Sequence, residues 1–374
     1  MRYKTFQDLQ LSALGMGCMR LPLKGGNSEI DEEQTARMAA YAMAHGINYF
    51  DTAWGYHGGN SESVMGKILS AYPRDAYHLA SKFPGYDLAN MPKVQEIFAR
   101  QLERCQSEYF DFYLFHNVCE LNIDAYLNEE YGILDHLLKQ KEAGRIRHLG
   151  FSAHGSIPVM ERFLNAYGEH MEFCQIQLNY LDWSLQDAKG KVELLNARHI
   201  PIWVMEPLRG GKLCALDEEA MSELQKLRPQ ESMSGWAFRF LQSIPGVTMI
   251  LSGMSDMQQL QENIETFADE QPLNEDEMKT LTGIGRRMST SVPCTACRYC
   301  IEHCPRSLDI PELIRLYNDM VYSDGSFSAR NAVNALPADK QPSACIGCGH
   351  CQALCPQQIH IPDIMRDLAR RISE

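Results

Sequence analysis

Eight cysteines near the C-terminal end of the chain form two blocks with the same spacing. The first block is Cys294, Cys297, Cys300 and Cys304, and the second is Cys345, Cys348, Cys351 and Cys355. In each block, two gaps of two residues precede one of three, and a proline follows the last cysteine. Such short gaps let one loop wrap three thiolates around a cube of iron and sulfide, while the fourth thiolate reaches a different cube.

The spacing therefore predicts two 4Fe–4S clusters whose ligands cross over between the blocks. One cluster is expected to take Cys294, Cys297, Cys300 and Cys355, and the other Cys345, Cys348, Cys351 and Cys304. Pro305 and Pro356 are expected to keep each block from returning to its own cluster. The alternative is structural zinc, whose four ligands usually come as two separated pairs. Two identical quartets that each end in Cys-Pro favour iron–sulfur clusters.

Over about residues 290–360, the two blocks resemble the two-cluster bacterial ferredoxins. The segment between the blocks, 305–343, is longer than in compact ferredoxins, so we expect an elaborated form of their small fold. It contains an expected helix, Pro311–Met320, and a polar loop, Tyr322–Ala329.

Four polar residues in the first half of the chain form a second set with coherent chemistry. Asp51, Lys82 and His116 each follow a short apolar run, and Tyr56 comes five residues after Asp51. A carbonyl that accepts a hydride develops negative charge on oxygen and needs a proton donor there. Tyrosine is a poor acid near neutral pH until a cation stabilises its phenolate. Lys82 can supply that cation and Asp51 can hold it, while His116 can donate a hydrogen bond to the substrate oxygen.

The elements that must position this set alternate between short apolar runs and helical stretches up to residue 288. The runs are Ala13–Cys18, Ile47–Phe50, Tyr77–Ala80, Phe112–Phe115, Ile146–Phe151, Phe173–Leu178, Ile202–Met205 and Thr248–Leu251. Bounded apolar runs of this kind indicate strands buried on both faces. Eight strand–helix units over roughly 250 residues predict a (β/α)8 TIM barrel, an α/β fold whose chemistry sits at the carboxyl ends of the strands.

The expected division of the chain is a barrel over residues 1–288 and a mainly helical, ferredoxin-like domain over 289–374. The linker Ser289-Thr290-Ser291 leads into the cysteine-rich part. The residues before Ser12 are expected to form a small hairpin that plugs the bottom of the barrel.

The first part of the chain, about residues 1–285, also resembles the aldo-keto reductase family. The motifs are Phe50-Asp51-Thr52-Ala53-x2-Tyr56 with Glu62 and Gly66, then Ser81-Lys82, then Phe115-His116. The resemblance implies an NAD(P)-dependent interconversion of a carbonyl and an alcohol. It makes Tyr56 the general acid/base and Lys82 the partner that lowers its pKa. Asp51 becomes the support of the lysine and His116 orients the substrate.

The same resemblance implies a nicotinamide site at the later strand ends. Ser152 and Gln177 match the carboxamide ligands, and Met205 stands where the family has an aromatic residue against the nicotinamide. The pyrophosphate loop is Pro207-Leu208-Arg209-Gly210-Gly211, and the adenosine segment contains Ser252, Gly253, Glu262 and Asn263.

This cofactor site departs from the family pattern at several positions. Ala153 replaces an asparagine, while Gly253 and Gln259 stand where basic residues for a 2′-phosphate are expected. A phosphate without arginine or lysine loses a charge-assisted contact, so NADH and NADPH both stay open. Arg209 is either a substitute phosphate ligand or a surface cation.

Aromatic residues just beyond strand ends are expected to wall the substrate pocket. They are Trp54, Tyr86, Tyr180 and Trp183. His154 either touches the substrate or makes a local structural hydrogen bond. Pockets for small molecules are commonly lined by such side chains.

Composition excludes several classes of partner. The formal charge of -13 argues against binding to nucleic acid or to an acidic membrane, which needs a basic face. The apolar runs are far shorter than the about 20 residues of a membrane helix. The first ten residues, MRYKTFQDLQ, lack the apolar core of a signal peptide. We therefore expect a cytoplasmic protein acting on a small-molecule carbonyl compound.

Three functions remain open from the sequence. In the first, the barrel reduces a carbonyl or an activated double bond with NAD(P)H, or with electrons that a ferredoxin or flavodoxin partner delivers through the clusters. In the second, the barrel is a plain NAD(P)H reductase and the clusters are a structural staple or an oxygen sensor. In the third, the protein transfers electrons and the barrel is a scaffold. The intact set of Asp51, Tyr56, Lys82 and His116 argues against the third.

Overall fold

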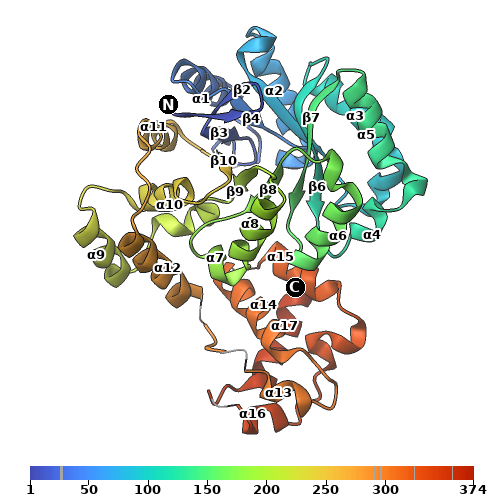
Figure 1. The fold of residues 1–374 in the computed structure, drawn as a ribbon, viewed down its shortest axis with the longest axis vertical. Coiled ribbons are helices and arrows are strands. Elements are labelled where there is room, and N and C mark those ends of the chain that lie inside the picture. The colour runs from blue at the N-terminus through green and yellow to red at the C-terminus, as the bar shows by residue number, and fades with distance from the viewer. Residues whose placement is uncertain (26–27, 290, 295–296, 324, 356) are drawn as a thin grey trace.

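The computed structural model describes residues 1–25, 28–289, 291–294, 297–323, 325–355 and 357–374. Thr290 of the expected linker and Pro356 of the second cysteine block lie outside the described residues. A closed eight-stranded barrel with surrounding helices is followed by a helical C-terminal part that extends to one side (Figure 1). The predicted (β/α)8 architecture is confirmed.

Each apolar run forms a strand of the barrel. The strands are β3 (Leu14–Gly17), β4 (Tyr49–Asp51), β5 (His78–Phe83), β6 (Phe110–Val118), β7 (Ile146–Ala153), β8 (Cys174–Gln177), β9 (Ile202–Met205) and β10 (Val247–Ser252). Neighbours in the chain pair in parallel, and β10 pairs with β3 through Ser252 and Met16, which closes the barrel. Because all strands run in one direction, their carboxyl ends meet at one rim.

The opposite rim is closed by a hairpin, as predicted. Strands β1 (Tyr3–Phe6) and β2 (Leu9–Ser12) pair antiparallel. Phe6 is buried against residues inside the barrel and meets Trp203 edge-on, with ring centroids 5.0 Å apart. The hairpin therefore leaves the carboxyl-end rim of the barrel open to a ligand.

Helices cover the outside of the barrel. They are α1 (Glu32–Ala44), α2 (Ser61–Leu69), α3 (Val94–Arg104), α4 (Ile123–Tyr126), α5 (Ile133–Glu142), α6 (Ile157–Tyr167), α7 (Asp182–Leu185), α8 (Ala188–Ala197), α9 (Glu218–Leu227), α10 (Met233–Gln242), α11 (Met257–Thr266) and α12 (Glu275–Ser289). Helix α1 begins where the Asp31 side chain accepts a hydrogen bond from the Gln34 amide, a standard N-cap. None of the described helices is long and apolar enough to cross a membrane.

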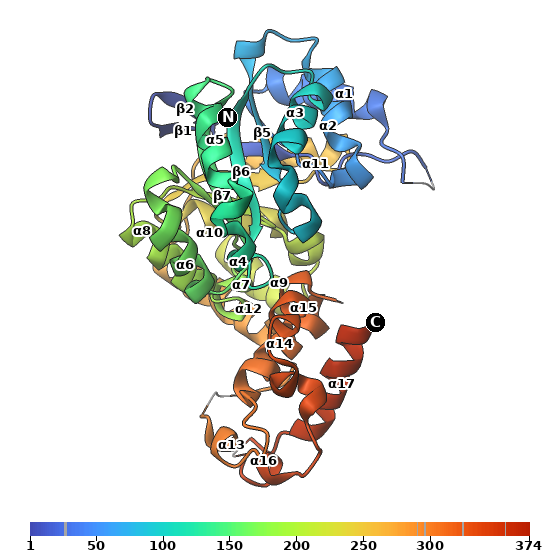
Figure 2. The ribbon, with the colours of Figure 1, turned by 90° about the vertical axis from the view of Figure 1, so that its right-hand side faces the viewer.

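The C-terminal part has a separate apolar core. Its helices are α13 (Tyr299–Glu302), α14 (Ile310–Ser323), α15 (Phe327–Asn334), α16 (His350–Ala353) and α17 (Ile361–Ser373). The expected helix Pro311–Met320 lies within α14. The expected polar loop Tyr322–Ala329 is mostly wrong, because α14 continues to Ser323 and the Ser326 hydroxyl caps α15 by accepting from the Ala329 amide. Helices α14 and α15 lie beside the barrel, whereas α13 and α16 lie at the far end (Figure 2).

Candidate active site and iron–sulfur centre

Lys82 and Asp51 form a buried ion pair at the carboxyl-end rim. Lys82 Nζ donates to Asp51 Oδ1 at 2.6 Å and to the carbonyl of Thr52 at 2.8 Å. Burial favours the neutral amine, but the Asp51 carboxylate and the nearby Tyr56 outweigh it and raise the pKa of Lys82. The lysine is therefore held as an ammonium, with its Nζ 5.0 Å from the centre of the Tyr56 ring.

Tyr56 and His116 stand next to this pair with their protons in place. Burial raises the pKa of Tyr56 to about 12, against the opposing effect of Lys82, so the phenol is protonated near neutral pH. The resemblance implied a lowered pKa; here the lysine acts in that direction but desolvation is larger. The pKa of His116 lies well below its usual range, mainly because the ring is buried and also because the Lys82 ammonium is near. His116 is therefore a neutral imidazole. The two rings lie 6.1 Å apart between centroids.

Asp51, Tyr56 and His116 border one cavity of about 1340 Å3 at the carboxyl ends of the strands. Pockets that bind drug-sized ligands usually have volumes of about 300–1,000 Å3. This larger cavity therefore has room for a dinucleotide together with a small substrate. The predicted site residues that line it are Asp51, Tyr56, Tyr86, His116, His154, Gln177, Met205, Pro207, Leu208, Arg209, Gly210, Ser252, Gly253, Glu262 and Asn263. Lys82 and Ser152 are buried behind this lining.

Three expected pocket walls lie elsewhere. Trp54 packs against the barrel core, and the guanidinium of Arg104 stacks over its ring at 3.9 Å. Tyr180 is 1% exposed, and both Tyr180 and Trp183 meet the ring of Phe240 edge-on in the helical layer. All three residues follow strand ends, but their side chains turn outward to the helices, which corrects the expectation that they wall the cavity.

The cavity contains unpaired amide groups that sequence reasoning missed. Asn117 Oδ1 and Gln175 Oε1 are buried and have no hydrogen-bond partner among the described residues, and both side chains line the cavity. Such orphaned acceptors suit a ligand with amide N–H groups, as a nicotinamide carboxamide has. Gln175 was findable, because it lies two residues before Gln177 on β8 and alternate residues share a face.

The neighbouring predicted ligands are already held by the protein. Ser152 Oγ accepts from the backbone amide of Asn117 at 2.7 Å, and Gln177 Nε2 donates to Asp182 Oδ2 at 2.9 Å. Asn263 Nδ2 donates to Ser252 Oγ at 3.1 Å. These bonds fix the orientation of the side chains before any ligand arrives.

Arg209 is neither exposed nor free. It is 7% exposed, and its guanidinium donates to the carboxylates of Asp182 and Asp319 and to the hydroxyl of Ser323. The surface-cation alternative is therefore wrong, because Asp319 and Ser323 from α14 cover the side chain. Asp319 lies 110 positions away in the chain, and the sequence carries no signal for this pair.

Arg20 is a cation on the cavity wall that the sequence analysis did not single out. Its side chain lies over Gly253, and its guanidinium is 3.3 Å from a carboxylate oxygen of Glu206. Gln259 also lines the cavity and accepts from the Ser255 amide. Arg20 therefore places a positive charge near Gly253, where this chain lacks the basic residue that the family pattern has.

The C-terminal part supplies one wall of the same cavity. Its contributors are Ser323, Gly325, Ser326, Phe327 and Ser328. The Phe327 ring lies edge-on to His154 with centroids 6.2 Å apart, and Ser328 Oγ is 3.5 Å from His154 Nδ1. Burial lowers the pKa of His154 to about 4, so this imidazole is neutral. His154 thus both lines the cavity and has a local hydrogen-bond partner.

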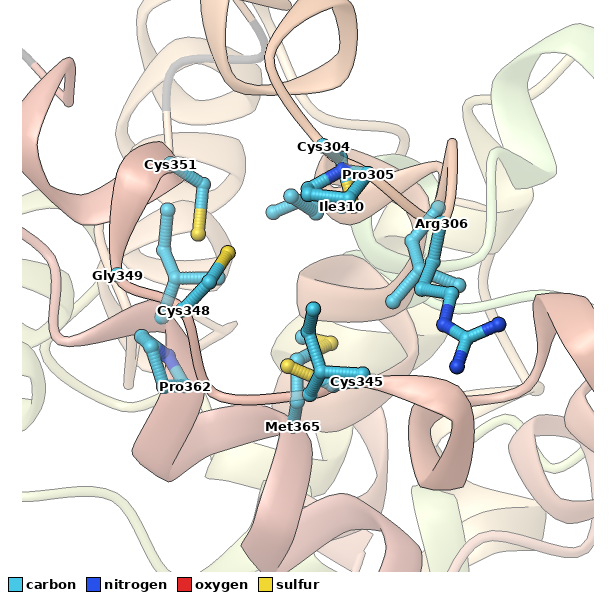
Figure 3. A pocket seen from close by; sticks show the side chains of 13 residues that line it. Cys304, Pro305, Arg306, Ile310, Cys345, Cys348, Gly349, Cys351, Pro362 and Met365 are labelled. Atoms are coloured by element: carbon cyan, nitrogen blue, oxygen red, sulfur yellow. The ribbon is translucent and has the colours of Figure 1, made fainter.

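The eight clustered cysteines line two hollows in the crossed combination. Cys304, Cys345, Cys348 and Cys351 surround one hollow, where their sulfur atoms face a common space (Figure 3). Cys294, Cys297, Cys300 and Cys355 line the other. Apolar side chains from α14 and α17 complete the walls, among them Ile310, Ile314 and Met365.

Each hollow is lined by four cysteines, three from one block and one from the other. Crossed ligation of 4Fe–4S clusters requires this set of ligands. Structural zinc usually takes its four ligands as two separated pairs, which a set of three plus one does not resemble. The lining of the hollows therefore fits iron–sulfur clusters.

Two family models match the chain in sequence. The model of the aldo/keto reductase family matches residues 13–286, and that of a 4Fe-4S dicluster domain matches residues 293–360. The oxidoreductase YqkF of Bacillus subtilis is 26% identical over 309 residues, which cover 73% of this chain and 92% of YqkF. The L-galactose dehydrogenase of Arabidopsis thaliana is 24% identical to this chain. That match covers 72% of this chain and 88% of the dehydrogenase.

Solved structures share the barrel. The holo form of aldo-keto reductase AKR11C1 from Bacillus halodurans has a TM-score of 0.63 at 22% identity, covering 76% of this chain and 96% of its own. An aldo-keto reductase from Klebsiella pneumoniae in complex with NADPH has a TM-score of 0.60 at 19% identity. The match covers 76% of this chain and 95% of the reductase. The chain belongs to the aldo/keto reductase family, and its barrel is followed by a 4Fe–4S dicluster domain, here called the iron–sulfur domain (residues 293–360).

Proposed function

We propose that the barrel reduces the carbonyl group of a small molecule, or an activated double bond, with NADH or NADPH. The observation that carries this proposal is the convergence of Asp51, Tyr56 and His116 on one cavity, with the Lys82 ammonium directly behind them. A protonated phenol, a cation and a neutral imidazole are the groups needed where an oxyanion develops.

Each residue has a separate role in the proposed reaction. A bound nicotinamide supplies the hydride to the carbonyl carbon. Tyr56 Oη gives its proton to the carbonyl oxygen, and the Lys82 ammonium stabilises the phenolate that remains. Asp51 and the Thr52 carbonyl hold that ammonium in place. The neutral His116 donates a hydrogen bond that orients the substrate oxygen.

The proposed cofactor site follows the strand ends from β7 to β10. Ser152, Asn117, Gln175 and Gln177 would hold the carboxamide of the nicotinamide, and Met205 would contact its ring. The segment Pro207-Leu208-Arg209-Gly210-Gly211 would hold the pyrophosphate. Ser252, Gly253, Glu262 and Asn263 would hold the adenosine. The similar reductase that was solved with NADPH supports a dinucleotide in this position.

The iron–sulfur domain is proposed to hold two 4Fe–4S clusters with crossed ligands. Each cluster would carry one electron at a time from a ferredoxin or flavodoxin partner. As an alternative to hydride from NAD(P)H, two such electrons and two protons would reduce the carbonyl to the alcohol. The contact of this domain with the cavity wall favours a part in turnover over a purely structural role. A plain reductase with structural clusters is the competing function, and serine variants of Cys294 and Cys345 separate the two.

The deciding experiment is an anaerobic purification followed by iron and sulfide analysis and by titration with NADH and NADPH. Reduction of 4-nitrobenzaldehyde by either dinucleotide supports the proposed reaction. Turnover that survives in Cys294→Ser and Cys345→Ser assigns the clusters a structural role. A protein that binds neither dinucleotide contradicts the proposal.

A further inference from the structure

Asp319 lies where α14 of the iron–sulfur domain meets the barrel. It is 1% exposed, and its carboxylate accepts from Gln186 Nε2 at 3.0 Å, Ser326 Oγ at 2.7 Å and Ser323 Oγ at 3.1 Å. It also accepts from the Arg209 guanidinium. A carboxylate with this many donors is firmly oriented, so it can fix the position of the arginine.

On the barrel side, the same guanidinium donates to Asp182, which is fully buried at the start of α7. Asp182 Oδ2 then accepts from Gln177 Nε2 at 2.9 Å and from Asn179 Nδ2 at 2.6 Å. A continuous series of polar contacts therefore runs from Asp319 through Arg209 and Asp182 to Gln177, which lines the cavity. The planar guanidinium, with its fixed donors, holds the two carboxylates in one geometry.

The other end of α14 borders the cysteine hollows. Ile310 lines one hollow, and Pro311 and Ile314 line the other. From Ile310 to Asp319 a helix rises about 14 Å. One rigid element thus connects the cluster region with the polar series that ends at Gln177.

We propose that Asp319 is a positioning residue through which the iron–sulfur domain sets the dinucleotide affinity of the barrel. This inference rests on the proposed function, because it takes Gln177 as a carboxamide ligand. With Asp319 in place, Arg209 holds Asp182, and Asp182 aims the Gln177 amide into the cavity. Without it, Arg209 and Asp182 lose their fixed geometry and the amide is no longer preorganised.

The test is the dissociation constant of NADH and NADPH for the cluster-loaded Asp319→Asn protein, measured anaerobically by calorimetry. Because the variant weakens the hydrogen bonds that orient Arg209 and Asp182, we expect the dissociation constant to rise about tenfold, which corresponds to about 1.4 kcal/mol. The rate at saturating dinucleotide should change much less. Asp339→Asn, which changes an exposed carboxylate of the same domain, is the matched control and should bind as the wild type does.

A double-mutant cycle separates positioning from general damage. If Asp319 acts through Gln177, then Asp319→Asn should have little further effect in a Gln177→Ala background. Fully additive effects would overturn the inference. Should Asp319→Asn not fold, Gln186→Ala removes one donor to the carboxylate and should weaken binding in the same direction. Unchanged affinity in the folded variants also overturns it, whereas a wild type that binds no dinucleotide refutes the proposed function instead.

Discussion

Phe327 of the iron–sulfur domain and His154 of the barrel meet edge-on at one cavity, with ring centroids 6.2 Å apart. Phe327 is 55% exposed, although it borders the site where a substrate is expected. An aromatic ring left open to a cavity offers apolar contact to whatever binds there. We therefore expect the iron–sulfur domain to share in substrate recognition through this ring.

Replacing this ring should weaken substrate binding more than chemistry. We expect Phe327→Ala to raise KM for 4-nitrobenzaldehyde about fivefold, which corresponds to about 1 kcal/mol, with kcat nearly unchanged. Steady-state kinetics at saturating dinucleotide measure both constants. Leu227→Ala, which removes an exposed apolar side chain from α9, is the control. An unchanged KM in Phe327→Ala would show that the ring does not contact the substrate.

Removal of the Tyr56 hydroxyl should abolish most of the turnover. General acid catalysis contributes about 10²–10⁴-fold, and Tyr56→Phe should lower kcat by that range. Dinucleotide affinity should stay the same, because the hydroxyl serves the substrate oxygen. Stopped-flow measurement of the first turnover tests the chemical step directly. A variant that keeps wild-type rates would exclude Tyr56 as the proton donor.

Removal of the Lys82 ammonium should lower the stability of the barrel, because it leaves the buried Asp51 carboxylate without its cation. Breaking a buried ion pair on one side costs about 3–5 kcal/mol, so Lys82→Met should lower the thermal midpoint clearly. The double variant Lys82→Met with Asp51→Leu should recover part of that loss, although it stays inactive. Equal midpoints in the two variants would contradict this account of the pair.

Stability should fall on acidification because of His154. Its pKa is about 4 in the folded protein, mainly because of burial, and about 6.5 in an unfolded chain. The unfolded state therefore binds the proton first. The contribution of the neutral His154 to stability is fully present above about pH 6.5 and is lost as the pH falls toward about pH 4. Thermal midpoints between about pH 7 and pH 5 should drop less in His154→Asn than in the wild type. Parallel curves would refute the assignment.

Crossed ligation predicts which cysteine variants behave alike. Cys355→Ser should damage the same cluster as Cys294→Ser, and Cys304→Ser the same cluster as Cys345→Ser. Each variant should lose about half of the iron and give one of two distinct electron paramagnetic resonance spectra after reduction. Pairing of Cys304→Ser with Cys294→Ser instead would mean that each block serves its own cluster.

The sequence predicted what depends on local spacing. The apolar runs fix the strands, the rim follows from their common direction, and Asp51, Lys82 and His116 follow from their places at strand ends. Side-chain direction beyond a strand end is not encoded so locally, which is why Trp54 and Tyr180 were misplaced. The contact of Arg209 with Asp319 depends on how two separately folded cores pack, and no periodic pattern reports that.

Because they share a cavity wall, neither the barrel nor the iron–sulfur domain can be exchanged for an unrelated domain without damage to the cavity. A chimera that carries an unrelated ferredoxin after α12 would keep its redox centres, yet strip one side from the cavity and leave Arg209 facing water. The barrel and the iron–sulfur domain are therefore fitted to each other along this seam. A sequence change on one side of this seam therefore limits which residues the other side can accept.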